Sequence, residues 1–261
     1  MTKQKTFGRS RPSIAYELEY RRELQKLLKE MQKDVQEQLE AYFSNTANDG
    51  ALSLWVDIFK RLREKWYRRF EVRGREIAKW LADKTKKRTD AQILRKLKEN
   101  GFTLTPHYTG EENALISQII ANNVAMIKSI PQSYLGEVQE AVSYSFKRGY
   151  DSERLYKRLK DIIGRVNENS DNRAQLIARD QMQKATQDFA IASAKEYGAT
   201  KGKWIHVPGR YSSRITHVHM DGEVFDLNVG LYDSDVHRNV KPGELPYCMC
   251  QFEVLMPGFD D

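Results

Sequence analysis

Apolar side chains recur at helical spacing in two long stretches near the start of the chain. From residue 12 to residue 43 they fall three and four positions apart, with charged residues between them, which is the pattern of an amphipathic helix. The polar stretch SNTANDG, at 44–50, separates this segment from a second one. We expect the second segment to be a long helix whose apolar stripe packs against a core or a partner. That stripe comprises Trp55, Phe59, Leu62, Trp66, Phe70, Ile77, Trp80 and Leu81.

Turn-forming residues mark the predicted ends of these helices. Gly101 indicates a helix end, and the stretch 98–112 is interpreted as a linker or a short hairpin. Helical periodicity then resumes through ALISQIIANNVAMIKSI, residues 114–130. After it, Pro131 is expected to open a helix, because proline is favoured in the first helical turn, and Gly149 is expected to close that helix.

Two more helices are predicted before the pattern changes. Asp151 or Ser152 is expected to cap the first of them, since short polar side chains satisfy free N–H groups at helix starts. The stretch 169–197 has helical periodicity over its whole length. Gly198 follows it directly and suits the position just after a helix end.

Short stretches after Gly198 alternate apolar and polar residues. KGKWIHVPG, GEVFDLNVG and PYCMCQFEVL show this pattern, which is typical of strands. On the last strand Cys248, Cys250 and Phe252 would share one side. The predicted fold class is therefore α+β and mostly helical, with long N-terminal amphipathic helices, a helical middle and a small C-terminal β-containing module from about residue 200.

The composition fits a soluble globular protein. The chain has 261 residues, of which 40% are hydrophobic and 30% are charged, which suffices for one large domain or two modest ones. No apolar run approaches the ~20 residues that a helix needs to cross a bilayer. The start, MTKQKTFGRSRPS, lacks the apolar stretch of a secretory signal. We therefore expect synthesis in a reducing cytoplasm and no membrane segment.

Basic residues are concentrated in the first part of the chain. The net charge is +7, and the stretch from Lys60 to Lys98 has 16 basic and five acidic side chains. Such a helix face attracts a phosphate backbone or an acidic protein surface, although a merely solvated face has the same composition. The candidate contacts to DNA or a protein partner lie mostly off the tryptophan stripe and are Arg61, Arg68, Arg69, Arg75, Lys79, Lys86 and Lys87.

The residues with the most distinctive chemistry lie near the end of the sequence. The only two cysteines form a Cys-x-Cys pair, and four of the five histidines fall in the same part of the chain. If RITHVHMDG were a strand, His217 and His219 would share one face, and the two pairs could form the tetrahedral His₂Cys₂ site that zinc prefers. We expect His217, Cys248 and Cys250 to bind zinc, with His219 or His237 as a further ligand.

Two other interpretations of these residues remain. The cysteines could be small buried hydrophobic residues, since free cysteine is among the most buried residue types. A nuclease-like site that combines the histidines with Asp221 and Arg214 is disfavoured, because such residues are common in polar turns. The sequence has no Gly-rich phosphate loop, nucleophile elbow or His-Glu-x-x-His motif, so no catalytic role is expected.

Three motifs, in this order, resemble a known family of phage proteins. RAQLIARDQMQKA (173–185) resembles the helix signature of the phage Mu protein F-like minor head proteins, also called the phage head morphogenesis family. RITHVHMDGEVF (214–225) resembles the family's Arg-x-x-His-x-x-x-Asp-Gly element, and KPGELPYCMC (241–250) resembles its closing element. The resemblance covers roughly residues 120–257. Its motif positions are Arg179, Arg214, His217, Asp221, Gly222, Pro242, Gly243, Cys248 and Cys250.

Some relatives differ from this chain within the motifs. They have Cys-x-x-Cys where this chain has Arg214 and His217, which implies a metal in those relatives. This chain is then short of ligands unless His219 or His237 substitutes. Met249 stands where relatives have arginine, and its side chain should point away from the cysteine pair.

The resemblance also implies a domain division and a role. Residues 1–115 would form a helical, basic N-terminal region and residues 116–261 the head morphogenesis domain. Family members are minor head proteins of tailed phages, needed for head assembly near the portal. The implied protein is a minor capsid protein of the phage head, made in the bacterial host cytoplasm, with portal, capsid or scaffold proteins as partners. The alternative is a DNA-binding protein, without sequence specificity, that escorts the phage genome during packaging or ejection.

Overall fold

The computed structural model describes residues 6–45, 51–101, 111–147, 152–209 and 212–256. Two compact units are present, each built from segments that are far apart in the sequence. The first, which we call the sheet unit, contains Met1–Leu18, Lys79–Ile120 and Ala178–Asp261. The second, the helical unit, contains Glu19–Ala78 and Ala121–Ile177. The predicted division at residue 115, which rests on motif coverage, stays a prediction.

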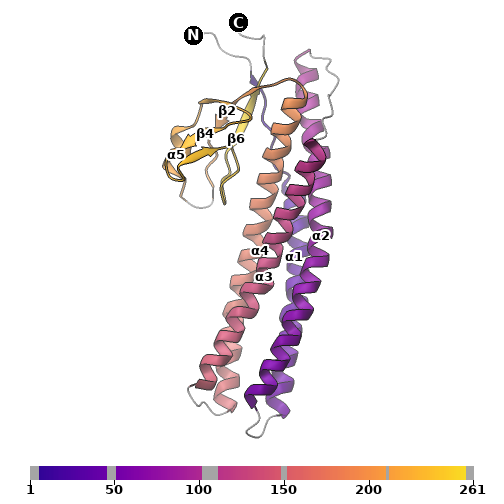
Figure 1. Cartoon of the computed structure of the whole chain (residues 1–261), viewed down its shortest axis with the longest axis vertical. Coiled ribbons are helices and arrows are strands. Elements are labelled where there is room, and N and C mark those ends of the chain that lie inside the picture. The colour runs from indigo at the N-terminus through magenta and orange to yellow at the C-terminus, as the bar shows by residue number, and fades with distance from the viewer. Residues whose placement is uncertain (1–5, 46–50, 102–110, 148–151, 210–211, 257–261) are drawn as a thin grey trace. The chain divides into compact units, whose positions relative to one another are not determined.

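Four long helices make up most of the described chain (Figure 1). They are α1 Ile14–Asn45, α2 Ala51–Glu99, α3 Glu111–Lys147 and α4 Ser152–Glu196. Burial follows the predicted periodicity, since Leu24, Leu28 and Val35 of α1 are completely buried while Lys29 and Lys33 are exposed. The mostly helical α+β class is therefore confirmed. None of the described helices has an apolar stretch long enough to cross a membrane.

Pro131 lies inside α3 and does not open a helix, so that prediction was wrong. A proline in a helix interior removes a backbone hydrogen bond and costs ~3 kcal/mol. The helix continues because its apolar face is buried on both sides of the proline: Ile127 and Ile130 before it, and Tyr134 and Leu135 after it, are all completely buried. Packing of this face outweighs the local cost.

A glycine ends α4 as predicted. Gly198 has a φ of 86°, and its N–H donates to the carbonyl of Lys195 at 2.9 Å. The next N–H, of Ala199, donates to the carbonyl of Ala194 at 3.0 Å. This pair of bonds is the Schellman arrangement, which satisfies carbonyls that a helix end leaves free.

Other predicted boundaries have different outcomes. The helix end at Gly149 and the cap at Asp151 lie outside the described residues, as does most of the predicted linker or hairpin at 98–112. α4 begins at Ser152 and runs past Gly164 to Glu196 as one helix, where the periodicity had predicted two.

In the helical unit, segments of all four helices pack around an apolar interior, and consecutive helices run in opposite directions (Figure 1). Trp55 and Trp66 of α2 are each 2% exposed, which confirms that these tryptophans are packing residues. The Trp66 indole N–H donates to Asp34 of α1 at 2.6 Å. Gly74 lets α2 approach α3 closely, because a Cβ there would lie 3.0 Å from Ile127.

The sheet unit contains a four-stranded antiparallel sheet and a separate hairpin. The sheet order is β1-β6-β2-β3, and its strands are Thr6–Phe7, Gln251–Leu255, Lys201–Ile205 and Val224–Asp226 respectively. The hairpin pairs β4, Leu231–Asp233, with β5, Arg238–Val240. The predicted C-terminal β-module is thus present. It also includes an N-terminal strand that the sequence pattern did not indicate.

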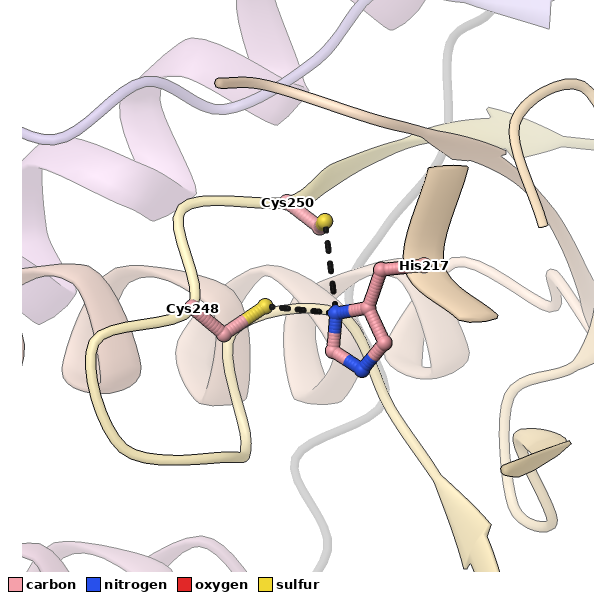
Figure 2. A group of neighbouring side chains, drawn as sticks. All are labelled: His217, Cys248 and Cys250. Carbon is pink, nitrogen blue, oxygen red and sulfur yellow. Dashed lines mark hydrogen bonds between the residues drawn. The ribbon is translucent and has the colours of Figure 1, made fainter. Parts of the chain in front are cut away.

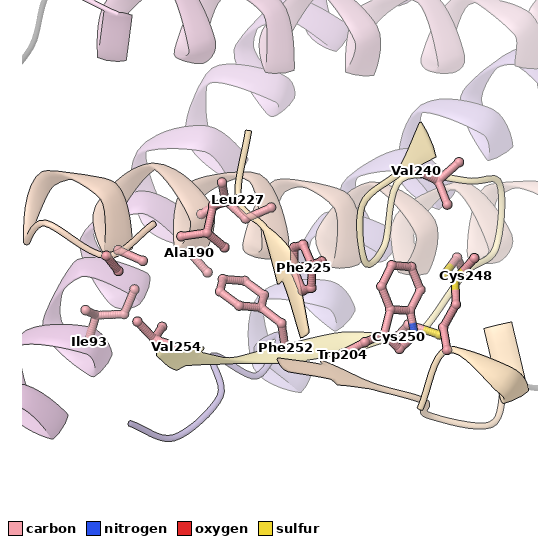
Figure 3. Close-up of a cluster of buried hydrophobic side chains, with 14 of the residues drawn as sticks. Ile93, Ala190, Trp204, Phe225, Leu227, Val240, Cys248, Cys250, Phe252 and Val254 are labelled. Carbon is pink, nitrogen blue, oxygen red and sulfur yellow. The ribbon is translucent and has the colours of Figure 1, made fainter. Parts of the chain in front are cut away.

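One face of the sheet packs together with residues of α4 and α2 in a single hydrophobic core (Figure 3). Alternate residues of the last strand and the turn before it point into this core: Cys250, Phe252 and Val254 are at most 3% exposed. Trp204 of β2 contacts Phe225 of β3 edge-on, with ring centroids 6.0 Å apart. The predicted alternation is therefore confirmed for Cys250 and Phe252.

Candidate metal centre

His217 lies on a short helix, α5, Ile215–His219, and not on the strand that the alternation had suggested. In a helix, residues two apart do not share a face. His217 itself is buried, with 2% of its surface exposed. His219 is exposed at the end of α5 and does not belong to the cluster that His217 forms with the cysteines.

Both cysteines lie in or next to a tight turn that leads into β6. The Cys248 N–H donates to the carbonyl of Leu245 at 3.1 Å. Tyr247, which directly precedes Cys248, has a φ of 60°. Pro246 precedes Tyr247, so the turn resembles type II with a residue other than glycine at its left-handed position. Such a residue costs of the order of 1–3 kcal/mol, and surrounding contacts must hold it in place.

Side chains of α4 and α5 supply these contacts. Asp180 of α4 accepts a hydrogen bond from the Tyr247 N–H at 2.7 Å. One turn further along α4, Gln183 donates to the carbonyl of Cys250 at 2.7 Å. Arg214, the residue before α5, donates to the carbonyl of the turn's proline at 3.1 Å. The cysteine-bearing turn is therefore fixed from two sides.

His217 directs one ring nitrogen at both cysteines (Figure 2). Its Nδ1 atom is 3.3 Å from the sulfur of Cys248 and 3.7 Å from that of Cys250, and the three potential ligand atoms all lie within 4.8 Å of one another. Around a tetrahedral zinc ion, nitrogen and sulfur ligands are separated by roughly 3.5 Å, given bond lengths of about 2.0 and 2.3 Å. The types of ligand atom and their spacing therefore fit such an ion.

A buried carboxylate holds the other nitrogen of His217. Nε2 is 3.1 Å from an oxygen of Asp233, a fully buried residue of β4. If Nε2 donates to this carboxylate, the lone pair of Nδ1 faces the sulfurs, as in metal-binding histidines that have a carboxylate partner. Burial lowers the pKa of His217, but the hydrogen bonds to Cys248 and Asp233 outweigh that effect and raise the pKa.

The two thiols influence each other's ionisation. A hydrogen bond with Cys250 acts against burial and, together with the neighbouring His217, lowers the pKa of the Cys248 thiol to about 4. The same hydrogen bond, together with burial, raises the pKa of Cys250. A thiolate is thus favoured at Cys248, and the thiolate is the form in which cysteine binds metals.

A cavity of about 250 Å³ opens beside the cluster and is lined by residues that include His206, Arg214 and Tyr247. Both cysteines also line this cavity. His237, the other predicted ligand, is exposed in the turn between β4 and β5 with a φ of 54°. It does not join the cluster.

Comparison with known proteins identifies the region that carries this cluster. Residues 136–253 match the family described as phage Mu protein F like protein. This part of the chain is thus similar to the phage Mu protein F-like family. It includes part of α3, all of α4 and the elements from β2 into β6. It therefore contains His217 and both cysteines.

A relative from a bacterium extends the similarity to nearly the whole chain. An uncharacterized protein of Haemophilus influenzae is 28% identical over 255 residues, which is 94% of this chain and 54% of the relative. The chain thus spans about half the length of that relative. No solved structure matches the chain.

Other motif residues of the Mu F-like region shape the backbone around the cluster. Asp221 accepts a hydrogen bond from the N–H of His206 at 2.7 Å. Gly222, with a φ of 84°, donates its N–H to the carbonyl of Trp204 at 2.8 Å. Gly243 has a φ of 79°, and a Cβ at this position would lie 2.8 Å from a glutamine side chain of α4. Gly243 therefore lets the backbone approach α4 closely.

Two motif residues have less distinct surroundings. Pro242 is buried, and Arg179 of α4 is half-buried. Within the described part of the chain, no hydrogen bond or ion pair explains why an arginine is placed at position 179.

Sequence reasoning missed four residues around the cluster: His206, Asp233, Asp180 and Gln183. The last two could have been noticed, because they are polar residues among the apolar ones that recur at helical spacing in this stretch, and the structure buries both. Such residues usually have a specific hydrogen-bond partner. The roles of His206 and Asp233 depend on contacts between distant segments.

The basic residues of α2 differ in their availability to a partner. Lys86 is half-buried and forms ion pairs with Asp90 and Glu112. Its charge is therefore already paired within the chain and is less available to a partner. Arg69 pairs with Glu30 of α1, and Arg75 with Glu71 on its own helix. Four others are exposed and have no carboxylate partner within the described stretches: Arg61, Arg68, Lys79 and Lys87.

Proposed function

We propose that the protein is a minor capsid protein of a tailed phage or prophage that acts in head morphogenesis. The match of residues 136–253 to the phage Mu protein F-like family carries this proposal, since that family is one of phage head morphogenesis. The chain spans only 54% of the Haemophilus influenzae relative. The role proposed for the whole protein is therefore inferred from the matched region.

The finer role that we propose is assembly near the portal. The partners would be the portal protein and the major capsid or scaffold proteins, and the site of action would be the phage head, after synthesis in the host cytoplasm. Contacts within the matched region support a structural role. Asp180, Gln183 and Arg214 each form a hydrogen bond with the backbone of one turn. Contacts of this kind stabilise a backbone conformation.

Deletion of the gene from an inducible prophage tests this function. Purified heads from the parent should contain the protein in a low copy number by quantitative mass spectrometry. Heads made without it should be fewer or should lack DNA, and the intact gene supplied in trans should restore them. Normal yields of infectious particles from the deletion, with no protein in parental heads, would contradict the proposal.

The second candidate function is binding of the phage genome without sequence specificity. It is supported by the four exposed basic residues of α2 that lack carboxylate partners in the described structure, Arg61, Arg68, Lys79 and Lys87. Phosphate contacts position a protein on DNA but carry no base information. Each contact releases counterions, so the log–log salt dependence on duplex DNA has a slope of about −0.9 per contact.

Filter binding of labelled duplex and single-stranded DNA at two salt concentrations tests this second candidate. Replacement of the four residues by glutamine should flatten the slope by roughly three to four units. A control variant with the same loss of charge replaces four exposed lysines elsewhere, Lys26, Lys29, Lys157 and Lys160, and should keep the slope. If the unmodified chain has no affinity at about 50 mM salt, where screening is weak, the basic residues serve protein contacts or solvation.

A further inference from the structure

His206 lies next to the three-residue cluster but comes from a different segment. It directly follows β2, which pairs with β6 so that Ile205 is opposite Gln251. If this antiparallel register continues by one residue, His206 is opposite Cys250. Side chains of directly opposed residues are neighbours on the same face, and the His206 Nδ1 atom is indeed 3.6 Å from the Cys250 sulfur.

The Asp-Gly pair after α5 fixes the backbone at His206. The His206 N–H donates to the carboxylate of Asp221 at 2.7 Å. The N–H of Gly222 donates to the carbonyl of Trp204, two residues before His206, at 2.8 Å. The stretch that supplies His217 therefore also positions a second histidine.

We propose that the protein binds one zinc ion through four ligands, His206, His217, Cys248 and Cys250. The sulfur of Cys250 is 3.6 Å from Nδ1 of His206 and 3.7 Å from Nδ1 of His217, close to the roughly 3.5 Å between such ligands on a tetrahedral zinc. Two thiolates and two imidazoles are a set that zinc prefers over harder cations. His206 is half-buried, and all four residues line the same cavity.

Among the described residues, neither of the other candidate histidines has a hydrogen bond to the three-residue cluster. His219 is exposed at the end of α5, and His237 is exposed in the turn between β4 and β5. All three histidines, His206 included, lie outside the group whose ligand atoms are within 4.8 Å of one another. His206 contacts that group through Cys250, which makes it the nearest available nitrogen donor.

Four protein ligands leave no open coordination position, which is typical of a structural zinc site. The ion would join three segments: the end of β2, helix α5 and the turn before β6. Asp233 would act through His217, by fixing which ring nitrogen carries the proton. Because zinc binding contributes free energy to folding, the ion would stabilise this module. The site stands independently of the proposed role in phage heads.

Metal analysis of the full chain, purified without chelators, tests the proposal. We expect close to one zinc per chain by mass spectrometry, and the intense visible spectrum of tetrahedral cobalt after exchange with Co²⁺. Competition with a chelator should show that His206→Ala weakens zinc binding at least ~100-fold, more than the loss of an outer-shell partner does. His219→Ala is the matched control, because His219 is exposed on the same helix as His217 but lies outside the cluster, and it should change the affinity less than about threefold.

A cysteine variant keeps the test valid if His206→Ala fails to fold. His206→Cys supplies a third thiolate, so it should still bind cobalt, with sulfur-to-cobalt charge-transfer absorption about one and a half times that of the parent. Unchanged absorption in this variant would show that position 206 is not a ligand. The proposal is also wrong if the parent chain binds no stoichiometric zinc or cobalt, or if His219→Ala weakens binding as much as His206→Ala does.

Discussion

The Asp180 carboxylate of α4 accepts a hydrogen bond from the backbone N–H of Tyr247 at 2.7 Å. Tyr247 is the left-handed residue of the turn that carries the cysteines, and Asp180 is only 4% exposed. A helix side chain thus holds a strained backbone conformation one residue before Cys248. The geometry of the candidate ligands depends on a residue that would not itself touch a metal.

Replacement of Asp180 should therefore loosen the cysteine turn. Asp180→Ala removes the acceptor of this part-buried hydrogen bond, and loss of such an acceptor costs about 1–3 kcal/mol, so urea denaturation should show a free energy of unfolding lower by that amount. Asp161→Asn, on an exposed part of the same helix, is the control and should stay within about 0.5 kcal/mol of the parent. Equal stability of the Asp180 and Asp161 variants would mean that the turn holds its shape unaided.

The carboxylate behind His217 should affect zinc affinity without binding zinc. Asp233→Asn keeps the size of the side chain but removes the charge next to Nε2, 3.1 Å away. Loss of such a partner typically weakens metal binding 10–100-fold, which chelator competition would measure. Glu223→Gln removes an exposed charge from the same module and should have no such effect. An Asp233 variant with parental zinc affinity would remove this residue from the site.

A methyl group at Gly202 should disrupt the core under the sheet. A Cβ at this position would lie 2.8 Å from the ring of Phe252 and 3.1 Å from Leu227, and overpacking of this kind costs typically about 1–3 kcal/mol. The matched control is Gly136→Ala in α3, where a Cβ meets nothing within 4 Å. That change should stabilise the protein by up to about 1 kcal/mol, because alanine favours helix interiors. The midpoint temperature of thermal unfolding should thus fall for Gly202→Ala and rise for Gly136→Ala.

Asp188 on α4 should make stability depend on pH in the mildly acidic range. Burial, with a contribution from Glu244, raises the pKa of Asp188 to about 6 against the opposing effects of Lys241 and Lys184. A carboxyl with a raised pKa binds its proton more tightly in the folded state. Its favourable contribution is complete below the unfolded pKa, near 4, and is lost as the pH rises through about 6.

Asp188→Asn should flatten this dependence. At pH 7 the variant should be more stable than the parent by an amount on the order of 1–3 kcal/mol, and at pH 4 the difference should largely disappear. Urea denaturation at both pH values measures the two differences. A variant that is less stable than the parent at pH 7 would show that the ionised carboxylate has a favourable partner.

The long helices could be predicted because the buried face of a helix produces a local sequence pattern, with apolar residues three and four positions apart. Leu24 and Leu28 of α1 show this. The continuity of α3 through Pro131 could not be predicted, since the compensating force is packing against other helices. Helix α5 was mistaken for a strand because five residues are too few for periodicity to separate the two structures.

The candidate site shows the same division between local and distant information. The cysteine pair could be recognised from residue type and spacing alone, and so could His217. His206 was missed because its position depends on the register between β2 and β6, and Asp233 because it lies on a hairpin between them in the sequence. Cross-strand register is set by the pairing of segments far apart in the chain, which a single sequence does not reveal.

The pairing of β1 with β6 has a consequence for the order of folding in the cell. Thr6 pairs with Leu255, so the ribosome makes one strand roughly 250 residues before its partner. At about 5–20 residues per second, roughly 10–50 s separate the two. During that interval β1 has exposed backbone groups and no partner, a state that favours pairing with other chains. Ribosome-bound chains arrested before residue 251 should therefore be sensitive to protease at β1, and this strand should become protected only when β6 has left the ribosome.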